Sequence, residues 1–227
     1  MRLIAGGAAM RKNDMILRTS FGVRLCHWVM VVCFFLVAAT GLSWLFPSFS
    51  WLGGVLGTPQ MARALHPFLG ILVFLFLIYL FVHLVGSNLY QRNDLIWAKN
   101  VAKVLRNEHA ENLRVGRYNL GQKFLFWGIM GLICALLLTG LMIWRAYFAQ
   151  YFPIPLLRLA LLAHSLAGLA LILLVIGHIY LAIWVRGSIT GMITGYVSRA
   201  WAKTHHDGWY AEVVAREDRD DLNARSK

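Results

Sequence analysis

Charged side chains are scarce in this chain of 227 residues. Only 14% of its residues are charged and only ten are Asp or Glu, while 59% are hydrophobic. Soluble domains usually carry about 25% charged residues, so this shortage excludes an ordinary soluble domain. Four stretches contain no Asp, Glu, Lys or Arg at all: residues 25–62, 64–91, 124–144 and 159–185. Each is long enough to cross a hydrocarbon core of about 30 Å as an α-helix, which rises about 1.5 Å per residue.

Cysteine is also rare, and the paired cysteines typical of metal sites are missing from the sequence. Cys26, Cys33 and Cys134 lie in or beside apolar stretches, and none belongs to a CxxC or CxxCH sequence. This spacing argues against structural disulfides, zinc and covalently attached c-type haem, and favours small buried thiols. The basic first segment leads directly into a span without an early small-residue cleavage site, so we expect no cleavable signal peptide.

The apolar stretches predict an all-α integral membrane protein, a four-helix bundle that forms a single membrane domain over residues 1–227. We expect its spans at about 20–46, 59–86, 120–145 and 156–186, with a loop over 87–119 and a tail over 187–227. The first stretch holds a span and a loop with turn-forming residues Pro47, Gly53, Gly54, Gly57 and Pro59. The long loop is expected to contain a short amphipathic helix that lies on the membrane surface or against a partner subunit. The helical spacing of its apolar residues indicates this: Trp97, Val101, Val104 and Leu105.

The positive charge is unevenly placed along the chain. Of 22 Lys and Arg residues, 19 fall in the N-terminus through Arg24, in residues 92–123 and in the tail from Arg186. Since basic residues concentrate on the cytoplasmic side, both termini and the middle loop are expected in the cytoplasm. The net charge of +12 is therefore explained by topology, and nucleic acid is not expected as a partner.

Histidine is expensive inside lipid, and span four contains two, His164 and His178. Their separation of fourteen residues places them about 21 Å apart along a helix axis and about 40° apart around it, on one face. Span two supplies His66 near the outer side, and span one supplies His27 near the cytoplasmic side. Depth therefore predicts two pairs, His66 with His164 and His27 with His178. The alternatives are histidines that serve packing or proton relay, and a His27 that is merely interfacial beside Trp28.

Each pair matches a bis-histidine haem b, because neutral imidazole is a good iron ligand. Such a haem has no open axial position and transfers electrons. Two haems b, one near each face, would make the bundle an electron path across the membrane. Four arginines near the interfaces are candidates for pairing with haem propionates or, alternatively, ordinary anchors: Arg18, Arg24, Arg63 and Arg158.

The remaining histidines fit this scheme poorly. His83 is rotated about 100° from the face of His66 and is close to the cytoplasmic exit, so we expect an interfacial or snorkelling side chain. We expect His109 in the polar loop to be solvated, and likewise the adjacent His205 and His206 in the tail.

A short internal repeat supports the choice of ligands. Thr40-Gly-Leu is followed 26 residues later by His66-Pro-Phe-Leu-Gly70, and Thr139-Gly-Leu is followed 25 residues later by His164-Ser-Leu-Ala-Gly168. The repeat predicts that the two histidines are equivalent and face each other, with a glycine one turn on leaving space for a ring. A chance match of this length is the alternative.

The start of span three combines polar residues with glycine. Asn119 is followed three residues later by Gln122, as in a capping box, and capping alone is one interpretation. The other is a quinone site, in which Asn119 and Gln122 supply hydrogen bonds, Gly121 allows close approach of the ligand, and His178 lies at the same depth.

The sequence closely resembles the cytochrome b gamma subunits of membrane-bound respiratory formate dehydrogenases over nearly its whole length. The resemblance rests on Arg18-Thr, Cys26-His-Trp, Gly57-Thr-Pro-Gln-Met, His66-Pro-Phe, Asn107-Glu-His, Tyr118-Asn-Leu-Gly-Gln-Lys, Phe148-Ala-Gln-Tyr-Phe-Pro, Gly187-Ser-Ile, Trp201-Ala-Lys and His205-His206. These strings are long and specific.

The resemblance implies a subunit of the bacterial inner membrane, with two b haems, that takes electrons from an iron–sulfur beta subunit at the periplasmic face. It would pass them to menaquinone near the cytoplasmic face, contributing to the proton motive force. Formate oxidation would belong to a molybdenum- or tungsten-containing alpha subunit, and the complex could form a higher oligomer. The implied haem ligands are His27, His66, His164 and His178, and the implied quinone site comprises Asn119, Gly121, Gln122 and His178.

Two other functions share parts of this pattern. The cytochrome b subunit of a nickel–iron hydrogenase or related reductase has the same kind of bundle, without the strings quoted above. A haem-free membrane anchor or transporter would use intramembrane histidines for packing or proton relay.

Overall fold

A computed structural model describes residues 14–101, 114–185 and 187–226. It divides into two compact units. The first, the bundle unit, takes in Phe21–Leu89 and Gly121–Trp184, and the second, the terminal unit, takes in Met1–Ser20, Tyr90–Leu120 and Val185–Lys227 as far as they are described. His109, Val104 and Leu105, on which sequence predictions fell, lie outside the described residues.

Four helices of the bundle unit are long and apolar enough to cross a membrane, among the residues that the structure describes. They are α1 (Phe21–Leu45), α2 (Pro59–Leu84), α5 (Leu120–Ile143) and α6 (Ile154–Trp184). Their ends agree with the four predicted spans to within two residues. The agreement follows from the fixed thickness of the bilayer, where a chain must satisfy its backbone groups internally as a helix. The protein is thus an all-α integral membrane bundle, as predicted.

All four helices contribute to one apolar core. It consists of Cys33, Val73, Leu77, Met130, Ile133 and Leu171. The outer faces are apolar as well: Leu162, Leu166 and Leu173 on α6 are each more than half exposed. A bundle with an apolar exterior is expected for helices that face lipid on their outer side.

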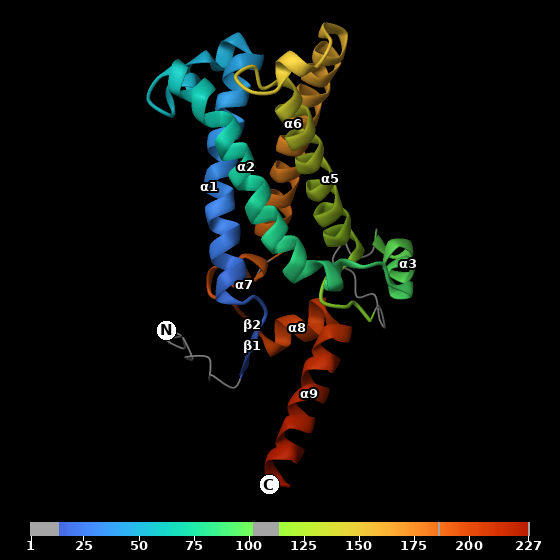
Figure 1. Cartoon of the computed structure of the whole chain (residues 1–227). Coiled ribbons are helices and arrows are strands. Elements are labelled where there is room, and N and C mark those ends of the chain that lie inside the picture. The colour runs from blue at the N-terminus through green and yellow to red at the C-terminus, as the bar shows by residue number, and fades with distance from the viewer. Residues whose placement is uncertain (1–13, 102–113, 186, 227) are drawn as a thin grey trace, which may run out of the picture. The chain divides into compact units, whose positions relative to one another are not determined.

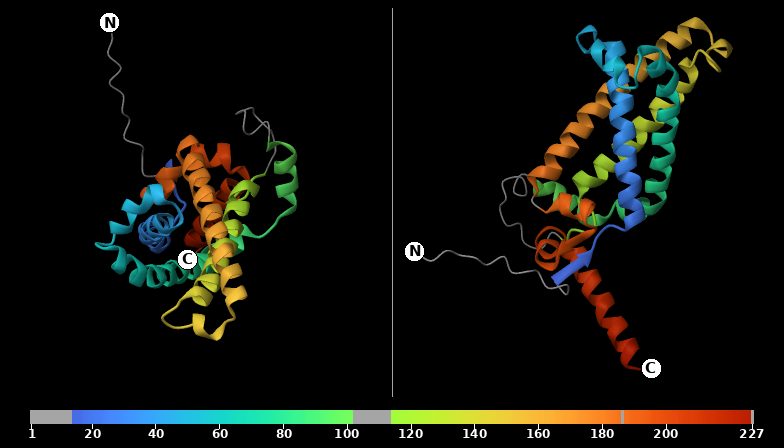
Figure 2. Two further views of the ribbon diagram at one scale, coloured as in Figure 1. Left: turned by 90° about the horizontal axis from the view of Figure 1, so that it is seen from above. Right: turned by 90° about the vertical axis from the view of Figure 1, so that its left-hand side faces the viewer.

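Two short connections lie at one end of the bundle, in blue-green and yellow in Figures 1 and 2. The first contains the 3₁₀ helix η2 (Pro47–Gly54), and the second contains η4 (Ala149–Tyr151). Thr58 caps α2 by accepting a hydrogen bond from the Met61 amide at 3.1 Å, and Pro59 takes the first helical position, as the sequence predicts. At the other end, η3 (Val85–Asn88) continues α2, and the Trp127 indole of α5 donates to the Asn88 carbonyl at 3.1 Å.

The terminal unit joins parts of the chain that are far apart in sequence. Strands β1 (Met15–Leu17) and β2 (Tyr196–Ser198) pair antiparallel, with Ile16 opposite Val197. The helices of this unit are α3 (Arg92–Lys99), α7 (Ser188–Ile193), α8 (Arg199–His205) and α9 (Asp207–Arg225). Gly187 precedes α7 with φ of 90°, and a side chain there would meet the Trp201 ring, so glycine is required at this position. The strands are a feature that the sequence analysis did not predict.

The prediction that His206 is solvated is wrong, whereas His205 is exposed as expected. His206 is 2% exposed, and its Nδ1 lies 2.9 Å from the Gly116 carbonyl oxygen. A carbonyl only accepts, so Nδ1 carries the proton and Nε2 accepts from the Arg18 guanidinium at 3.2 Å. Burial, together with the positive charge of Arg18, lowers the pKa of His206 to about 3. The imidazole is therefore neutral at physiological pH.

Arg18 lies at the centre of this unit with aromatic rings around it. Its guanidinium carbon is 4.8–5.6 Å from the ring centres of Tyr118, Trp201 and Trp209, distances at which a cation is attracted to a π face. Its Nη2 donates to the Arg117 carbonyl at 2.6 Å, and Arg117 donates in return to the Arg18 carbonyl. Desolvation lowers the pKa of Arg18 to about 10, which leaves it charged at neutral pH. Arg18 therefore holds the N-terminal strand against the tail.

Candidate functional site

His66 on α2 and His164 on α6 lie together inside the bundle unit. The centres of their rings are 6.4 Å apart and the ring planes are inclined by 59°. Trp44 of α1 packs against His66 with ring centres 4.9 Å apart. The structure thus brings together the two histidines that depth and the internal repeat predict to face each other.

The spacing of these rings fits a metal ion between them. An imidazole nitrogen binds a transition metal at about 2 Å and lies about 1 Å from its own ring centre, so two axial imidazoles have centres about 6 Å apart. Among the described residues, no group of three or more His, Cys, Asp and Glu side chains gathers as a metal site. A metal bound mainly by protein needs about four such ligands, whereas a haem iron needs only two because the macrocycle supplies the others. The pair therefore suits haem b.

A threonine of a neighbouring helix holds each of these two rings. Thr40 Oγ1 of α1 lies 2.7 Å from His66 Nδ1, and Thr139 Oγ1 of α5 lies 3.0 Å from His164 Nδ1. Both threonines belong to the internal repeat, but their contact with the histidines was not predicted from the sequence. The nearly equal spacing between each Thr-Gly sequence and the following histidine was the feature of the sequence that could have indicated this contact.

His27 on α1 and His178 on α6 form the second predicted pair. The two side chains are near enough to interact electrostatically, and α1 and α6 are in contact. His27 Nδ1 is buried without a hydrogen-bond partner, and the ring meets Trp28 edge-on at 5.3 Å. A buried imidazole nitrogen of this kind is costly unless a ligand or partner satisfies it. This pair too is compatible with an iron ligand role.

His83 does not belong to either pair. It is exposed, its Nδ1 lies 2.8 Å from the Tyr79 carbonyl one turn earlier, and its ring packs on Tyr79. This environment agrees with the predicted interfacial side chain.

The predicted quinone residues lie at the start of α5. Gly121 and Gln122 belong to the first turn of that helix in the bundle unit, while Asn119 precedes the helix and belongs to the terminal unit. Antiparallel contacts fix the register of α5 with α6: a side chain at Gly140 would meet His164, and one at Gly128 would meet Leu174. If the same register continues to the start of α5, Gln122 and His178 differ in depth along the bundle by about one helical turn, roughly 5 Å.

The four arginines considered for haem propionates have different surroundings. Arg63 and Arg158 are exposed near the loop end of the bundle, and Arg24 lies over the Phe21 ring at 5.8 Å. Arg18 is buried in the terminal unit, with the partners described above.

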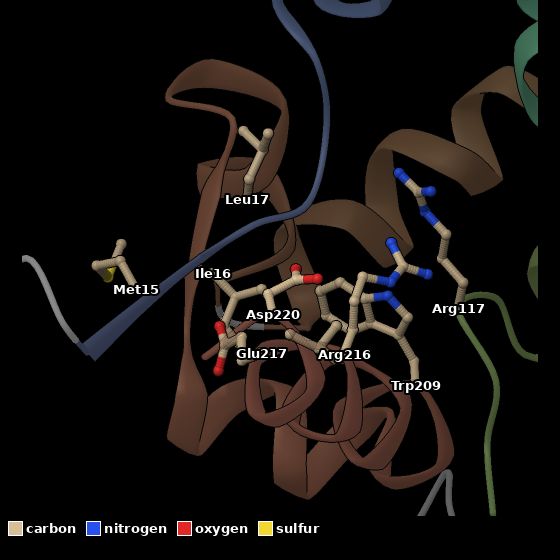
Figure 3. Close-up of a pocket in the computed structure, with 9 residues that line it drawn as sticks. Met15, Ile16, Leu17, Arg117, Trp209, Arg216, Glu217 and Asp220 are labelled. Carbon is tan, nitrogen blue, oxygen red and sulfur yellow. The ribbon is translucent and has the colours of Figure 1, made fainter. Parts of the chain in front are cut away.

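One pocket of about 350 Å³ lies in the terminal unit (Figure 3). Its walls come from β1, α9 and Arg117, and they carry both signs of charge, with Arg216 beside Glu217 and Asp220. None of the four candidate ligands lines it.

Known proteins match this chain over most of its length. Residues 18–195 match the family described as Prokaryotic cytochrome b561. The nitrate-inducible formate dehydrogenase cytochrome b556(Fdn) subunit of Escherichia coli (strain K12) is 50% identical over 208 residues, which cover 92% of this chain and 96% of that protein. The cytochrome b556(fdo) subunit of formate dehydrogenase from the same strain is 48% identical over 204 residues, covering 90% and 96%. A formate dehydrogenase cytochrome b556 subunit of Haemophilus influenzae is 47% identical over 215 residues, covering 93% and 89%.

Proposed function

The chain belongs to the prokaryotic cytochrome b561 family, among the cytochrome b subunits of formate dehydrogenase, and we propose that it carries electrons across the membrane to a quinone. The electrons come from formate, which a partner subunit oxidises. The observation that carries the proposal is the His66–His164 pair, whose ring spacing of 6.4 Å fits two axial ligands of one iron.

Two b haems are proposed, held by His66 with His164 and by His27 with His178. A bis-histidine haem supplies reversible one-electron oxidation and reduction, with no coordination position left for another ligand. The protein residues determine where this happens. On α6, His164 and His178 are separated by about 21 Å along the axis, so the two pairs lie at different depths of the same bundle.

The direction of transfer follows from the proposed topology. The protein is proposed to lie in the inner membrane of a bacterium, and the distribution of its basic residues supports cytoplasmic termini. The end of the bundle with η2 and η4 then faces the periplasm. There it would receive electrons from an iron–sulfur beta subunit, whose own donor is a molybdenum- or tungsten-containing alpha subunit.

The quinone, menaquinone, is proposed to bind at the cytoplasmic end, near His178 and the start of α5. The antiparallel register of α5 with α6 supports this site, since it brings Gln122 and His178 to nearly the same depth. Gly121 has no side chain to obstruct a ring, and Asn119 and Gln122 offer amide groups that donate to a carbonyl. Reduction at this end takes protons from the cytoplasm, so inward electron flow contributes to the proton motive force.

The test is reduction of the purified complex, isolated by a tag on this chain. We expect a visible spectrum of b-type haem, co-purification of an iron–sulfur subunit and a molybdenum or tungsten subunit, reduction of the haem by formate and reoxidation by a menaquinone analogue. A colourless chain would contradict the haem assignment. A haem that is reduced by hydrogen and not by formate would instead indicate a hydrogenase partner.

A further inference from the structure

We propose that Thr40 and Thr139 are positioning residues that fix the tautomer and orientation of His66 and His164, so that each histidine presents Nε2 to the haem iron. The inference rests on the proposed function, since it concerns how this chain prepares one of the two sites.

The hydrogen bonds of Thr40 determine which atom donates the proton at His66. Thr40 Oγ1 lies 3.0 Å from the Leu36 carbonyl oxygen and 2.9 Å from that of Val37, on its own helix. A hydroxyl has one hydrogen and a carbonyl can only accept, so this hydrogen is committed to the backbone. The contact of 2.7 Å between Thr40 Oγ1 and His66 Nδ1 must then have the ring nitrogen as donor.

The same count applies independently at His164. Thr139 Oγ1 donates to the Ala135 carbonyl at 2.6 Å, with the Leu136 carbonyl at 3.3 Å. Thr139 therefore accepts from His164 Nδ1 at 3.0 Å. Two helices of different sequence thus use the same arrangement, which agrees with the internal repeat.

The consequence concerns the other nitrogen of each ring. A neutral imidazole has one N–H, and in both rings it is on Nδ1, so Nε2 keeps its lone pair. A metal-binding histidine normally donates its second nitrogen to an acceptor that fixes the tautomer and raises the basicity of the ligand. Thr40 and Thr139 supply these acceptors from within the bundle.

A glycine follows each threonine and lies beside the histidine ring. A Cβ at Gly140 would lie 3.1 Å from His164 Cε1, closer than most real contacts, whereas a Cβ at Gly41 would lie 3.7 Å from His66 Cε1, an ordinary distance. The absence of a side chain at Gly140 therefore leaves room for the His164 ring, whereas the space beside His66 is less restricted.

The other pair lacks this arrangement at His27, whose Nδ1 is buried without a partner. The effect of removing the threonine hydroxyls should therefore be confined to the haem of His66 and His164. The haem of His27 and His178 therefore serves as the control for the haem of His66 and His164 within the same molecule.

The test replaces each threonine with valine, which keeps the shape of the side chain and removes the acceptor, and with serine, which retains the hydroxyl. Redox titration and low-temperature EPR are recorded on the complex purified through this chain. In Thr40→Val and Thr139→Val we expect the potential of one haem to rise, because a weaker donor stabilises the oxidised iron less, and the low-spin signal of that haem to shift. The second haem should be unchanged, and Thr40→Ser and Thr139→Ser should restore both properties.

Two further comparisons separate positioning from general packing. Ser43→Ala removes a hydroxyl that donates to the Thr40 carbonyl at 2.7 Å rather than to a histidine ring, so it should leave both haems unaltered. Gly140→Ala should perturb the same haem as Thr139→Val, and Gly41→Ala should not. Loss of this haem in the valine variants and its retention in the serine variants also supports the proposal. The proposal would be overturned if the valine variants had unaltered haem potentials and EPR signals. It would also be overturned if the serine variants showed the same changes in potential and EPR signal as the valine variants. A wild-type complex without haem would instead overturn the proposed function.

Discussion

His66 and His164 face each other at a ring-centre distance of 6.4 Å, although they belong to helices α2 and α6. Each ring is held at Nδ1 by a threonine of a third or fourth helix. All four helices of the bundle therefore take part in this one arrangement. The packing of the helices therefore sets the spacing of the two rings.

Replacing single histidines should remove one haem at a time. His66→Ala or His164→Ala should halve the haem content and remove one set of redox and EPR features, because each iron depends on both of its ligands. His27→Ala or His178→Ala should remove the other set. The measurement is haem per protein together with redox titration.

His83→Ala is the matched control for these variants, since His83 is an exposed histidine of the same bundle. It should keep both haems. Loss of a haem in this variant, with retention in any of the four others, would show that the ligands are wrongly assigned.

Quinone reduction should be separable from haem binding. Gln122→Leu removes an amide of the proposed quinone site, and Asn119→Asp keeps a side chain able to cap α5. We expect haem reduction by formate to stay fast in both variants and reoxidation by the quinone to slow by tenfold or more, which corresponds to about 1.4 kcal/mol or more of lost interaction. Stopped-flow spectroscopy measures the two steps separately.

Capping alone makes a different prediction for the same residues. Loss of a cap costs about 1 kcal/mol of stability and leaves reoxidation nearly normal. If both variants show normal reoxidation kinetics, the quinone binds elsewhere.

Much of this arrangement is predictable from the sequence because the bilayer imposes it. Phe21–Leu45 and Ile154–Trp184 are long and apolar, with a single charged residue near the start of each, so composition alone marks them as spans. Depth along the helices then limits which histidines can meet. The placement of His66 beside His164 is a consequence of these two constraints.

The terminal unit could not be predicted in the same way. Strands of three residues pair across most of the chain, Met15 with Ser198, and such short segments carry almost no periodic signal. His206 lies next to exposed His205 and polar Asp207, so local sequence indicates solvent. Its burial depends on Gly116 and Arg18, which come from distant segments.

Formate oxidation should generate a membrane potential. An electron passing inward between the two histidine pairs crosses about 21 Å of a core roughly 30 Å thick, and a full crossing corresponds to about 2.3 kcal/mol per 100 mV. Vesicles of known orientation, with a potential-sensitive dye, should become positive on the periplasmic side. Turnover with menaquinone but without a potential would contradict the proposed direction of transfer.

Acid should destabilise the terminal unit through His206. The unfolded residue titrates near pH 6.5, whereas the folded one stays neutral until about pH 3 because burial, Arg18 and His205 disfavour its charge. Below pH 6.5 the unfolded state therefore binds a proton that the folded state does not. The contribution of His206 to the free energy of unfolding is fully present above pH 6.5 and decreases as the pH falls below that value. The slope for one proton is at most about 1.4 kcal/mol per pH unit. His206→Gln should flatten the dependence of the thermal midpoint between pH 7 and pH 5, measured by tryptophan fluorescence; an unchanged slope would contradict the assignment.

We propose that this single chain binds two haems b through four histidines. The most direct measurement is the haem content of the purified chain by pyridine haemochrome, combined with EPR of the oxidised protein. We expect two b-type haems per chain, both low-spin with bis-histidine signals, and two components in a redox titration. One haem per chain, or a high-spin iron with an open axial position, would contradict it.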